Sequence, residues 1–311
     1  MKTVLKIEGL SKNFGKRTII DNVSLETTSG EVFGFLGPNG AGKTTTIKML
    51  TGLLYSDGGK ISVCGYDLKK NYEKAMGQIG AIVENPELYG HLTGLQNLRY
   101  FARMKSGITK ERITEVTELV GLSGRINDKV SKYSLGMKQR LGIAVCVLHS
   151  PALLVLDEPT NGLDPEGIRL LRDVTKKLAH EEGICVFVSS HLMGEMEMMC
   201  DRVGIVIDGK MVDVKTVDEL VGSFSNMGQQ EYKITLDDTS KASALLTSNG
   251  YSITGVNHTT VTVSCDKKDL PVLNKLIVQS DILLELVEPV DKKHLEDVFL
   301  EMTKREGNQI A

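Results

Sequence analysis

The 311-residue sequence lacks an excess of charge of either sign. Its 37 lysines and arginines face 40 aspartates and glutamates, which leaves a formal net charge of -3. A chain without a basic excess has no general electrostatic attraction for nucleic acid or anionic lipid. The charge balance therefore argues against nonspecific DNA binding, and we expect no nucleic-acid partner.

A long hydrophobic run is also missing. The densest apolar stretch, residues 141–156, is interrupted by His149, Ser150 and Pro151. It falls short of the roughly 20 consecutive apolar residues that a helix needs to cross a bilayer, so we expect no transmembrane helix. Residues 1–10 alternate polar and apolar side chains, which favours an edge strand over a secretory signal.

Cysteine is scarce, and no two cysteines form a CxxC pair. Most of the five lie in apolar runs, where free thiols pack as small hydrophobic side chains. They are Cys64, Cys146, Cys185, Cys200 and Cys265. The pattern indicates a reducing, cytosolic compartment.

What is present is the composition of a globular protein, with 41% hydrophobic and 25% charged residues. Four apolar runs predict buried strands: one begins at Val32, and the others are residues 153–156, 184–188 and 203–207. Because helical patterns alternate with strand patterns, we expect a parallel sheet and the α/β class.

At roughly 100 to 200 residues per domain, the length predicts one large domain or two, and the pattern along the chain favours two. We place the first at residues 1–222, with a helical subdomain at about 86–149, where strand signals are weak. Small and polar residues then indicate a linker. A small α+β accessory domain is expected at 230–311. A helical stripe near its end consists of Leu295, Val298, Phe299 and Met302.

The strongest motif follows the first predicted strand. The pattern GxxxxGK[ST] lies between a strand and a helix, as phosphate binding requires. Its glycines let backbone N–H groups surround phosphates, Lys43 can reach the β- and γ-phosphates, and Thr44 can ligate Mg²⁺. The motif predicts a bound nucleoside triphosphate. The expected binding residues of this loop are Gly37, Pro38, Asn39, Gly40, Ala41, Gly42, Lys43, Thr44 and Thr45.

Two consecutive carboxylates, Asp157 and Glu158, end the strand at residues 153–156. The carboxyl ends of parallel strands are where ligands of such sheets bind. We expect Asp157 to hold Mg²⁺ and Glu158 to act as the general base for the attacking water. By itself, such a pair could also be a simple strand cap.

The order of these motifs resembles that of the ABC family, the ATPase subunits of ABC transporters, over about residues 5–220. Between the two motifs this family carries a signature loop, LSGGQ, and residues 133–137 read YSLGM. Ser134 and Gly136 match. The resemblance implies ATP and Mg²⁺ as cofactors, and a homodimer in which these two residues grip the γ-phosphate held by the partner subunit. The alternative is an ordinary helix N-cap at Ser134.

Three further positions match weaker family features. Phe14 lies where the family stacks an aromatic ring on adenine, although a lone Phe could equally be a core residue. Asp164 resembles a residue of the loop that couples the two subunits, or else begins an Asx turn. His191 resembles the catalytic switch histidine that contacts the γ-phosphate beside Lys43, where an isolated histidine would be a surface residue.

The family's glutamine near magnesium is replaced here by Glu84. A carboxylate can serve as a metal ligand, yet it adds negative charge beside the triphosphate. Glu84, the YSLGM loop and the segment LEDVFLE at 295–301 resemble the bacitracin- and lantibiotic-immunity exporter ATPases.

The resemblance implies an ATPase that drives export of a peptide antibiotic through separately encoded membrane permease subunits. Such a subunit would lie peripherally at the cytoplasmic face of the cell membrane. Two alternatives remain open: an exporter of a drug, lipid or ion, and a soluble ABC ATPase without a membrane partner. A GTPase predicts an [NT]KxD motif, which is absent.

Overall fold

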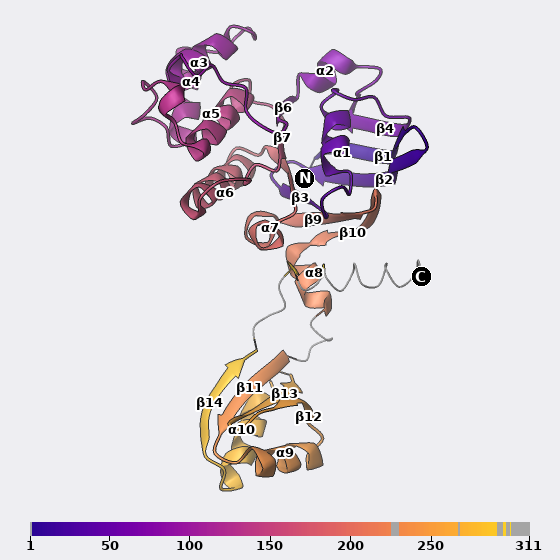
Figure 1. Ribbon diagram of the computed structural model, residues 1–311, viewed down its shortest axis with the longest axis vertical. Coiled ribbons are helices and arrows are strands. Elements are labelled where there is room, and N and C mark those ends of the chain that lie inside the picture. The colour runs from indigo at the N-terminus through magenta and orange to yellow at the C-terminus, as the bar shows by residue number, and fades with distance from the viewer. Residues whose placement is uncertain (1, 225–229, 267, 291–294, 297–298, 300–311) are drawn as a thin grey trace. The chain divides into compact units, whose positions relative to one another are not determined.

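The computed structural model describes residues 2–224, 230–266, 268–290, 295, 296 and 299. The chain forms two compact units, Met1–Val217 and Asp218–Ala311, and each is described by itself (Figure 1). Among the described residues, no helix has the length and apolar character needed to cross a membrane.

Six strands form the central sheet of the first unit, in the order β10-β9-β3-β8-β7-β6. Their bounds are Val32–Leu36 (β3), Ile79–Ile82 (β6), Leu153–Asp157 (β7), Cys185–Ser190 (β8), Arg202–Ile207 (β9) and Lys210–Thr216 (β10). All neighbours pair in parallel except β10, which is antiparallel to β9. Every residue of β3, β7 and β8 is buried, which is why these strands read as continuous apolar runs. The predicted α/β class is confirmed.

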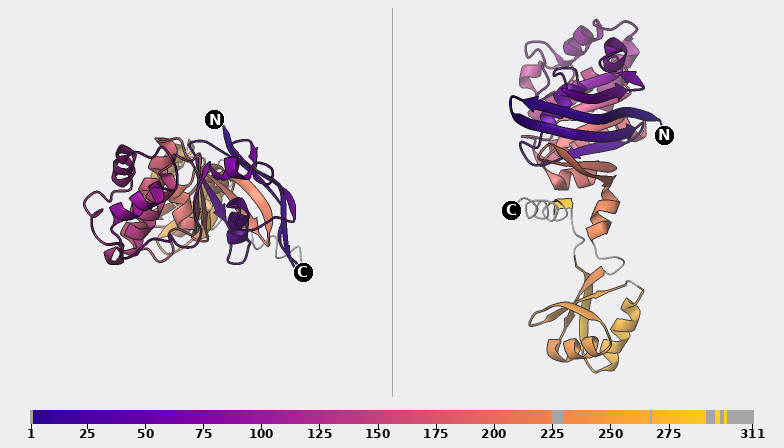
Figure 2. Two further views of the ribbon diagram at one scale, coloured as in Figure 1. Left: turned by 90° about the horizontal axis from the view of Figure 1, so that it is seen from above. Right: turned by 90° about the vertical axis from the view of Figure 1, so that its right-hand side faces the viewer.

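A second, antiparallel sheet has the order β2-β1-β4-β5. Its strands are Thr3–Phe14 (β1), Arg17–Thr28 (β2), Gly58–Val63 (β4) and Tyr66–Asp67 (β5). β1 pairs with both β2 and β4, so the expectation of an N-terminal edge strand was wrong. Its alternation arises because Leu5 and Ile7 face the core, whereas Lys6 and Glu8 are exposed and form an ion pair. The right-hand view of Figure 2 shows β1 and β2 side by side.

One hydrophobic core joins this sheet to the central sheet and to helix α1 (Lys43–Leu50). Phe187 lies at its centre, with its ring centroid 5.6 Å from that of Phe33 and 5.4 Å from that of Phe35. Three other helices of the unit are Tyr72–Met76 (α2), Pro165–His180 (α6) and Met193–Met199 (α7). The loop before α1 is thereby anchored on both sides by packed elements.

The thiol of Cys185 belongs to this core, and its Sγ lies 3.0 Å from Thr27 Oγ1. Burial raises the pKa of the Cys185 thiol to about 12. Because the thiolate is the reactive form, the ionised fraction near neutral pH falls by roughly a thousandfold relative to an ordinary thiol. We expect Cys185 to resist iodoacetamide in the folded protein and to react readily in guanidinium, as peptide mass spectrometry would show. Labelling of folded Cys185 ahead of the half-buried Cys64 would contradict this.

Helices fill the chain between β6 and β7. They are Gly94–Ala102 (α3), Lys110–Leu119 (α4), the 3-10 turn Val130–Lys132 (η1) and Leu135–Val147 (α5). α3 begins with a capping box: Thr93 Oγ1 accepts from the Gln96 backbone N–H at 3.1 Å, and Gln96 Oε1 accepts from that of Thr93 at 2.9 Å. This segment coincides with the region where the sequence shows weak strand signals.

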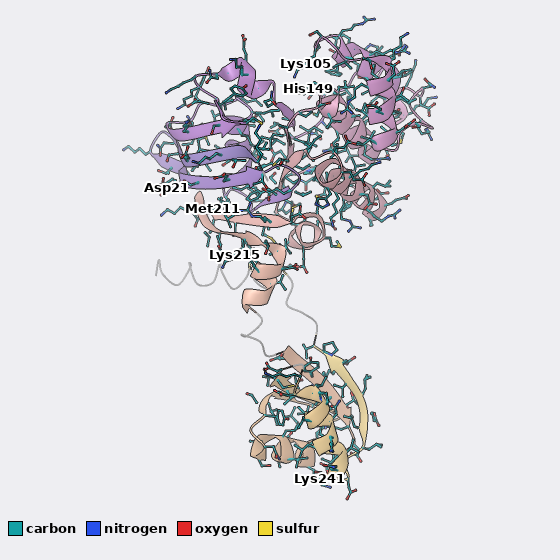
Figure 3. All side chains as sticks on the ribbon, turned by 180° about the vertical axis from the view of Figure 1, so that it is seen from behind. Asp21, Lys105, His149, Met211, Lys215 and Lys241 are labelled. Carbon is teal, nitrogen blue, oxygen red and sulfur yellow. The ribbon has the colours of Figure 1, made fainter. Side chains whose placement is uncertain are left out.

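His149 connects α5 to β7, and its Nε2 is buried without a hydrogen-bond partner among the described residues. Burial, together with the nearby Lys105 ammonium, lowers the pKa of His149, so the ring is neutral at pH 7 (Figure 3). A hydrogen bond with the Ile79 backbone acts in the opposite direction but is the smallest of the three effects.

The second unit contains helix α8 (Val217–Phe224, which starts at the boundary) and a βαββαβ succession. Its elements are Gln230–Leu236 (β11), Thr239–Ser248 (α9), Ser252–Val256 (β12), Thr260–Cys265 (β13), Leu270–Gln279 (α10) and Leu284–Pro289 (β14). The sheet is antiparallel, in the order β12-β13-β11-β14. Tyr232, Ile234 and Leu236 of β11 are buried, as their alternation predicts. Of the predicted terminal stripe, Leu295 is buried, while Val298 and Met302 lie outside the described residues.

Candidate functional site

Three adjacent strands of the central sheet deliver the candidate site. β3, β8 and β7 are neighbours and run parallel, so their carboxyl ends meet at one edge. The glycine-rich loop follows β3, Asp157 ends β7, and His191 comes directly after β8. Segments more than 100 residues apart in the chain are thus brought together, at the edge where ligands of parallel sheets bind.

The loop before α1 needs its glycines for two different reasons. Gly40 has φ +85°, a left-handed conformation, although a Cβ there would meet nothing within 4 Å. Gly42 has φ +96°, and a Cβ would also lie 2.4 Å from Ile20 Cδ1. A Cβ on Gly37 would lie 2.3 Å from the Val206 carbonyl oxygen. The backbone can adopt this cradle only where side chains are missing.

Lys43 lies inside the cradle, with its side chain 5% exposed. Its ammonium donates to the carbonyl oxygens of Gly37 at 2.8 Å and Pro38 at 3.2 Å, and lies 3.2 Å from Glu158 Oε1. A buried cation at the N-terminus of helix α1 is a suitable partner for phosphate oxygens.

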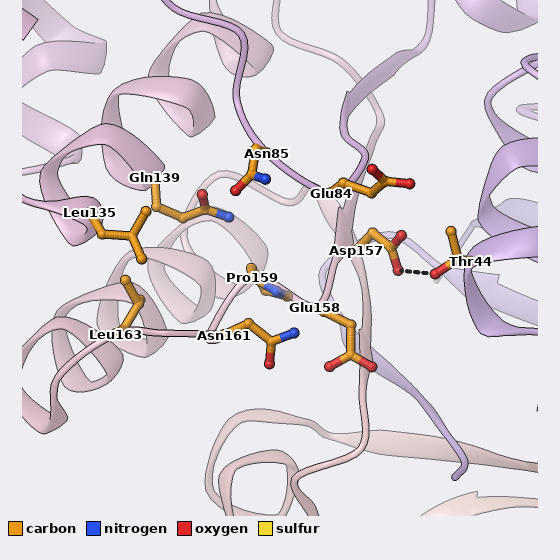
Figure 4. A pocket seen from close by; sticks show the side chains of 10 residues that line it. All are labelled: Thr44, Glu84, Asn85, Leu135, Gln139, Asp157, Glu158, Pro159, Asn161 and Leu163. Carbon is orange, nitrogen blue, oxygen red and sulfur yellow. Dashed lines mark hydrogen bonds between the residues drawn. The ribbon is translucent and has the colours of Figure 1, made fainter. Parts of the chain in front are cut away.

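Asp157 is buried and accepts two hydrogen bonds at Oδ1. Ser189 Oγ donates at 2.7 Å. Thr44 Oγ1 donates at 3.3 Å, the bond that Figure 4 draws as a dashed line. Among the described residues, no three His, Cys, Asp or Glu side chains form a metal cluster. Hydroxyl and carboxylate oxygens nevertheless fit Mg²⁺, which usually takes one or two protein ligands besides phosphate oxygens and waters.

Glu158 connects the predicted catalytic residues. Its Oε1 pairs with Lys43, and its Oε2 lies 2.7 Å from His191 Nδ1. The Glu158 backbone has φ +47°, and its N–H donates to Ser189 Oγ at 3.0 Å. Such a left-handed non-glycine residue is strained and must be held by its surroundings. Ser189 therefore holds the Asp157 carboxylate and the Glu158 backbone, a role that the sequence motifs did not assign.

A cavity of about 490 Å³ opens beside these groups. Its volume suits a drug-sized or nucleotide-sized ligand. It is lined by Phe14, Arg17, Ile19, Asn39, Gly40, Gly42, Lys43, Thr44, Thr45, Glu158, Asn161 and His191. Phe14, at the end of β1, is 53% exposed, so it is available for stacking rather than packed as a core residue. Arg17, Ile19 and Asn161 were missed from sequence, although Arg17 and Ile19 closely follow Phe14.

A second cavity, of about 240 Å³, shares Thr44, Glu158 and Asn161 with the first (Figure 4). It is lined by Thr44, Glu84, Asn85, Leu135, Gln139, Asp157, Glu158, Pro159, Asn161 and Leu163. All three carboxylates expected near the metal and the base thus border one space. Glu84 itself has φ +66°, and its Oε1 lies 2.9 Å from Lys48 Nζ. Leu135 belongs to the YSLGM loop, but neither Leu135 nor Gln139 was expected from sequence to line this space.

Ser134, Gly136 and Asp164 line neither of these two cavities. Within the chain the two polar residues are helix caps: Ser134 Oγ accepts from the Met137 N–H at 3.3 Å, and Asp164 Oδ1 from the Gly167 N–H at 2.9 Å. Ser134 and Asp164 are both exposed. Their expected role toward a partner subunit stays a prediction.

Comparison with known proteins agrees with this geometry. The family profile described as "ABC transporter" matches residues 20–161. The "Uncharacterized ABC transporter ATP-binding protein YhcH" of Bacillus subtilis (strain 168) is 50% identical over 304 residues, which cover 97% of each chain. The chain belongs to the ABC transporter family as an ATP-binding protein. It is thus a nucleotide-binding ATPase.

Two further matches of this ABC ATPase are informative. A solved structure, "Structure of ATP binding subunit of ABC transporter", is 31% identical with a TM-score of 0.63, over 71% of this chain and 93% of that one. The "Bacitracin transport ATP-binding protein BcrA" of Enterococcus faecalis is 35% identical over 303 residues, or 96% of each chain. The resemblance to the bacitracin and lantibiotic subgroup is confirmed. The match to BcrA includes the second unit.

Proposed function

We propose that this ABC ATPase powers export of a peptide antibiotic, such as bacitracin or a lantibiotic, and so confers resistance or immunity. The observation that carries the proposal is the likeness to BcrA over 96% of both chains, which extends beyond the ATP-binding unit. The second unit, from Asp218 onward, then serves as an accessory domain of the same kind of exporter.

The site supports a metal-assisted hydrolysis in which each residue has one task. Thr44 and Asp157 would hold Mg²⁺, which supplies charge neutralisation at the phosphates, and Glu84 would contribute from the neighbouring loop. Glu158 accepts a proton from water, and His191, 2.7 Å away, orients that carboxylate and reaches toward the γ-phosphate. Lys43 leaves its contact with Glu158 when a phosphate oxygen is available, which frees the base.

Two chains would form the complete catalytic unit. Ser134 caps the N-terminus of α5, and Asp164 caps the N-terminus of α6. Both caps are exposed, so a second subunit can reach them, together with Gly136 in the first turn of α5. In the proposed head-to-tail homodimer each signature loop meets the nucleotide of the opposite subunit, and a two-fold axis makes the two contacts equivalent.

Membrane permease subunits would be the partners that move the substrate. The ATPase then lies at the cytoplasmic face of the membrane and takes part in transport through its contact with them. To identify them, Glu158→Gln protein would be trapped with ATP, extracted in mild detergent and analysed by mass spectrometry. A multispanning membrane protein is the expected partner. Ribosomal or DNA-repair proteins in its place would overturn the transport proposal.

Antibiotic challenge tests the substrate. A strain without the gene should become several-fold more sensitive to bacitracin or a lantibiotic, and recover with the wild-type chain. Glu158→Gln should fail to restore resistance, because hydrolysis is required. The matched control Glu182→Gln, an exposed residue after α6, should restore it. Unchanged sensitivity to peptide antibiotics, with a change toward an unrelated drug, would refute the peptide substrate and keep the ATPase.

A further inference from the structure

Lys48 lies one helical turn after Thr44 on α1, and no motif assigns it a role. Its ammonium lies 2.9 Å from Glu84 Oε1, and the two side chains are 39% and 63% exposed. This contact joins the helix that follows the phosphate loop to the loop that follows β6. Glu84 is held there in a left-handed backbone conformation that a non-glycine residue rarely adopts.

The small cavity has an unusual concentration of negative charge. Glu84, Asp157 and Glu158 all border it. Glu158 pairs with Lys43, and Asp157 accepts hydrogen bonds from two hydroxyl groups. Among the ion pairs of the described residues, Lys48 is the cation that contacts Glu84.

A bound triphosphate makes the charge around this cavity more negative, because it adds several negative charges and competes with Glu158 for Lys43. Like charges close together repel, and at low ionic strength this repulsion also acts between exposed groups. An uncompensated Glu84 carboxylate would then oppose nucleotide binding, whereas a neutral side chain at this position would not. The Lys48 ammonium on α1 offsets that cost.

We propose that Lys48 is a positioning residue that holds the Glu84 carboxylate and neutralises its charge beside the nucleotide phosphates. The inference rests on the proposed placement of Mg²⁺ and phosphates at Thr44 and Asp157. It assigns a specific requirement to this chain: a carboxylate on the loop after β6 needs a cation on α1.

A double-mutant cycle on the full chain tests the coupling. Affinity for a fluorescent ATP analogue is measured in EDTA at low salt for wild type, Lys48→Met, Glu84→Gln and the double variant. We expect Lys48→Met to weaken binding about fivefold in the wild-type background and to have little effect in the Glu84→Gln background. Lys48→Arg should bind as wild type, and the effect should shrink at high salt because the charges are screened.

Controls separate charge from folding. Lys6→Met removes an exposed lysine from another ion pair, on β1, and should leave binding unchanged. The melting temperature of Lys48→Met should stay near that of wild type, because exposed ion pairs contribute little stability. Equal weakening by Lys48→Met in both backgrounds, or no weakening in either, overturns the inference while ATP binding by the wild type stands. Failure of the wild type to bind the analogue would instead overturn the proposed site.

Discussion

Replacement of Glu158 by glutamine is expected to reduce ATP turnover by about 10²- to 10⁴-fold, the range of a lost general base. The amide keeps the size of the side chain but cannot accept the proton of the attacking water. Binding should persist or tighten, because the variant also removes one negative charge from beside the phosphates. Phosphate release measures turnover, and equilibrium titration with MgATP measures binding.

The same variant should accumulate an ATP-dependent dimer, because hydrolysis no longer separates the two ATP-bound subunits. Size-exclusion chromatography with and without MgATP would detect it, and Glu182→Gln should behave as wild type. Turnover that stays within a few-fold of wild type would show that Glu158 is not the base. Loss of turnover without dimer formation would support Glu158 as the base but contradict the proposed ATP-dependent dimer.

Replacement of Lys43 by alanine should weaken nucleotide binding by about 100-fold or more. The wild-type side chain is 5% exposed, and its ammonium donates to two carbonyl oxygens of the loop. Charge-assisted hydrogen bonds contribute about 1.5–3 kcal/mol each, and about 1.4 kcal/mol is a factor of ten. Two such contacts to phosphates account for the expected loss, which isothermal titration would measure.

Lys6→Met is the matched control for Lys43→Ala, because it removes a lysine from an exposed ion pair on β1 and should leave binding unchanged. Circular dichroism should show that both variants stay folded. Retained tight binding in Lys43→Ala would mean that another loop holds the triphosphate. If Lys43→Ala does not fold, nucleotide binding would be measured with Lys43→Met, which preserves most of the side-chain volume.

Local motifs were sufficient for the core of the site. A glycine at positive φ, such as Gly42, is required by the turn itself, so the loop can be identified within nine residues. Asp157 and Glu158 are likewise identified by an apolar strand that ends in two carboxylates. These features depend on neighbours in sequence, and the structure has them in the predicted elements.

Other features depended on partners far away in sequence. The alternation of β1 could not distinguish an edge strand from an interior one, because strand pairing on both sides leaves the side-chain period unchanged. In the sequence, Ser189 is an ordinary residue of a predicted strand, and only the structure shows that it connects Asp157 to the Glu158 backbone. The Lys48 partner of Glu84 is 36 residues away and belongs to another element.

The sequence by itself determined the class of fold, the phosphate loop and the identity of the acid residues, because each is set by residues adjacent in the chain. Only the tertiary structure decided which of them meet. β3, β8 and β7 are neighbours in the sheet, so Lys43, Glu158 and His191 share one edge. Strand order is set by packing of the whole core, and local patterns carry no record of it.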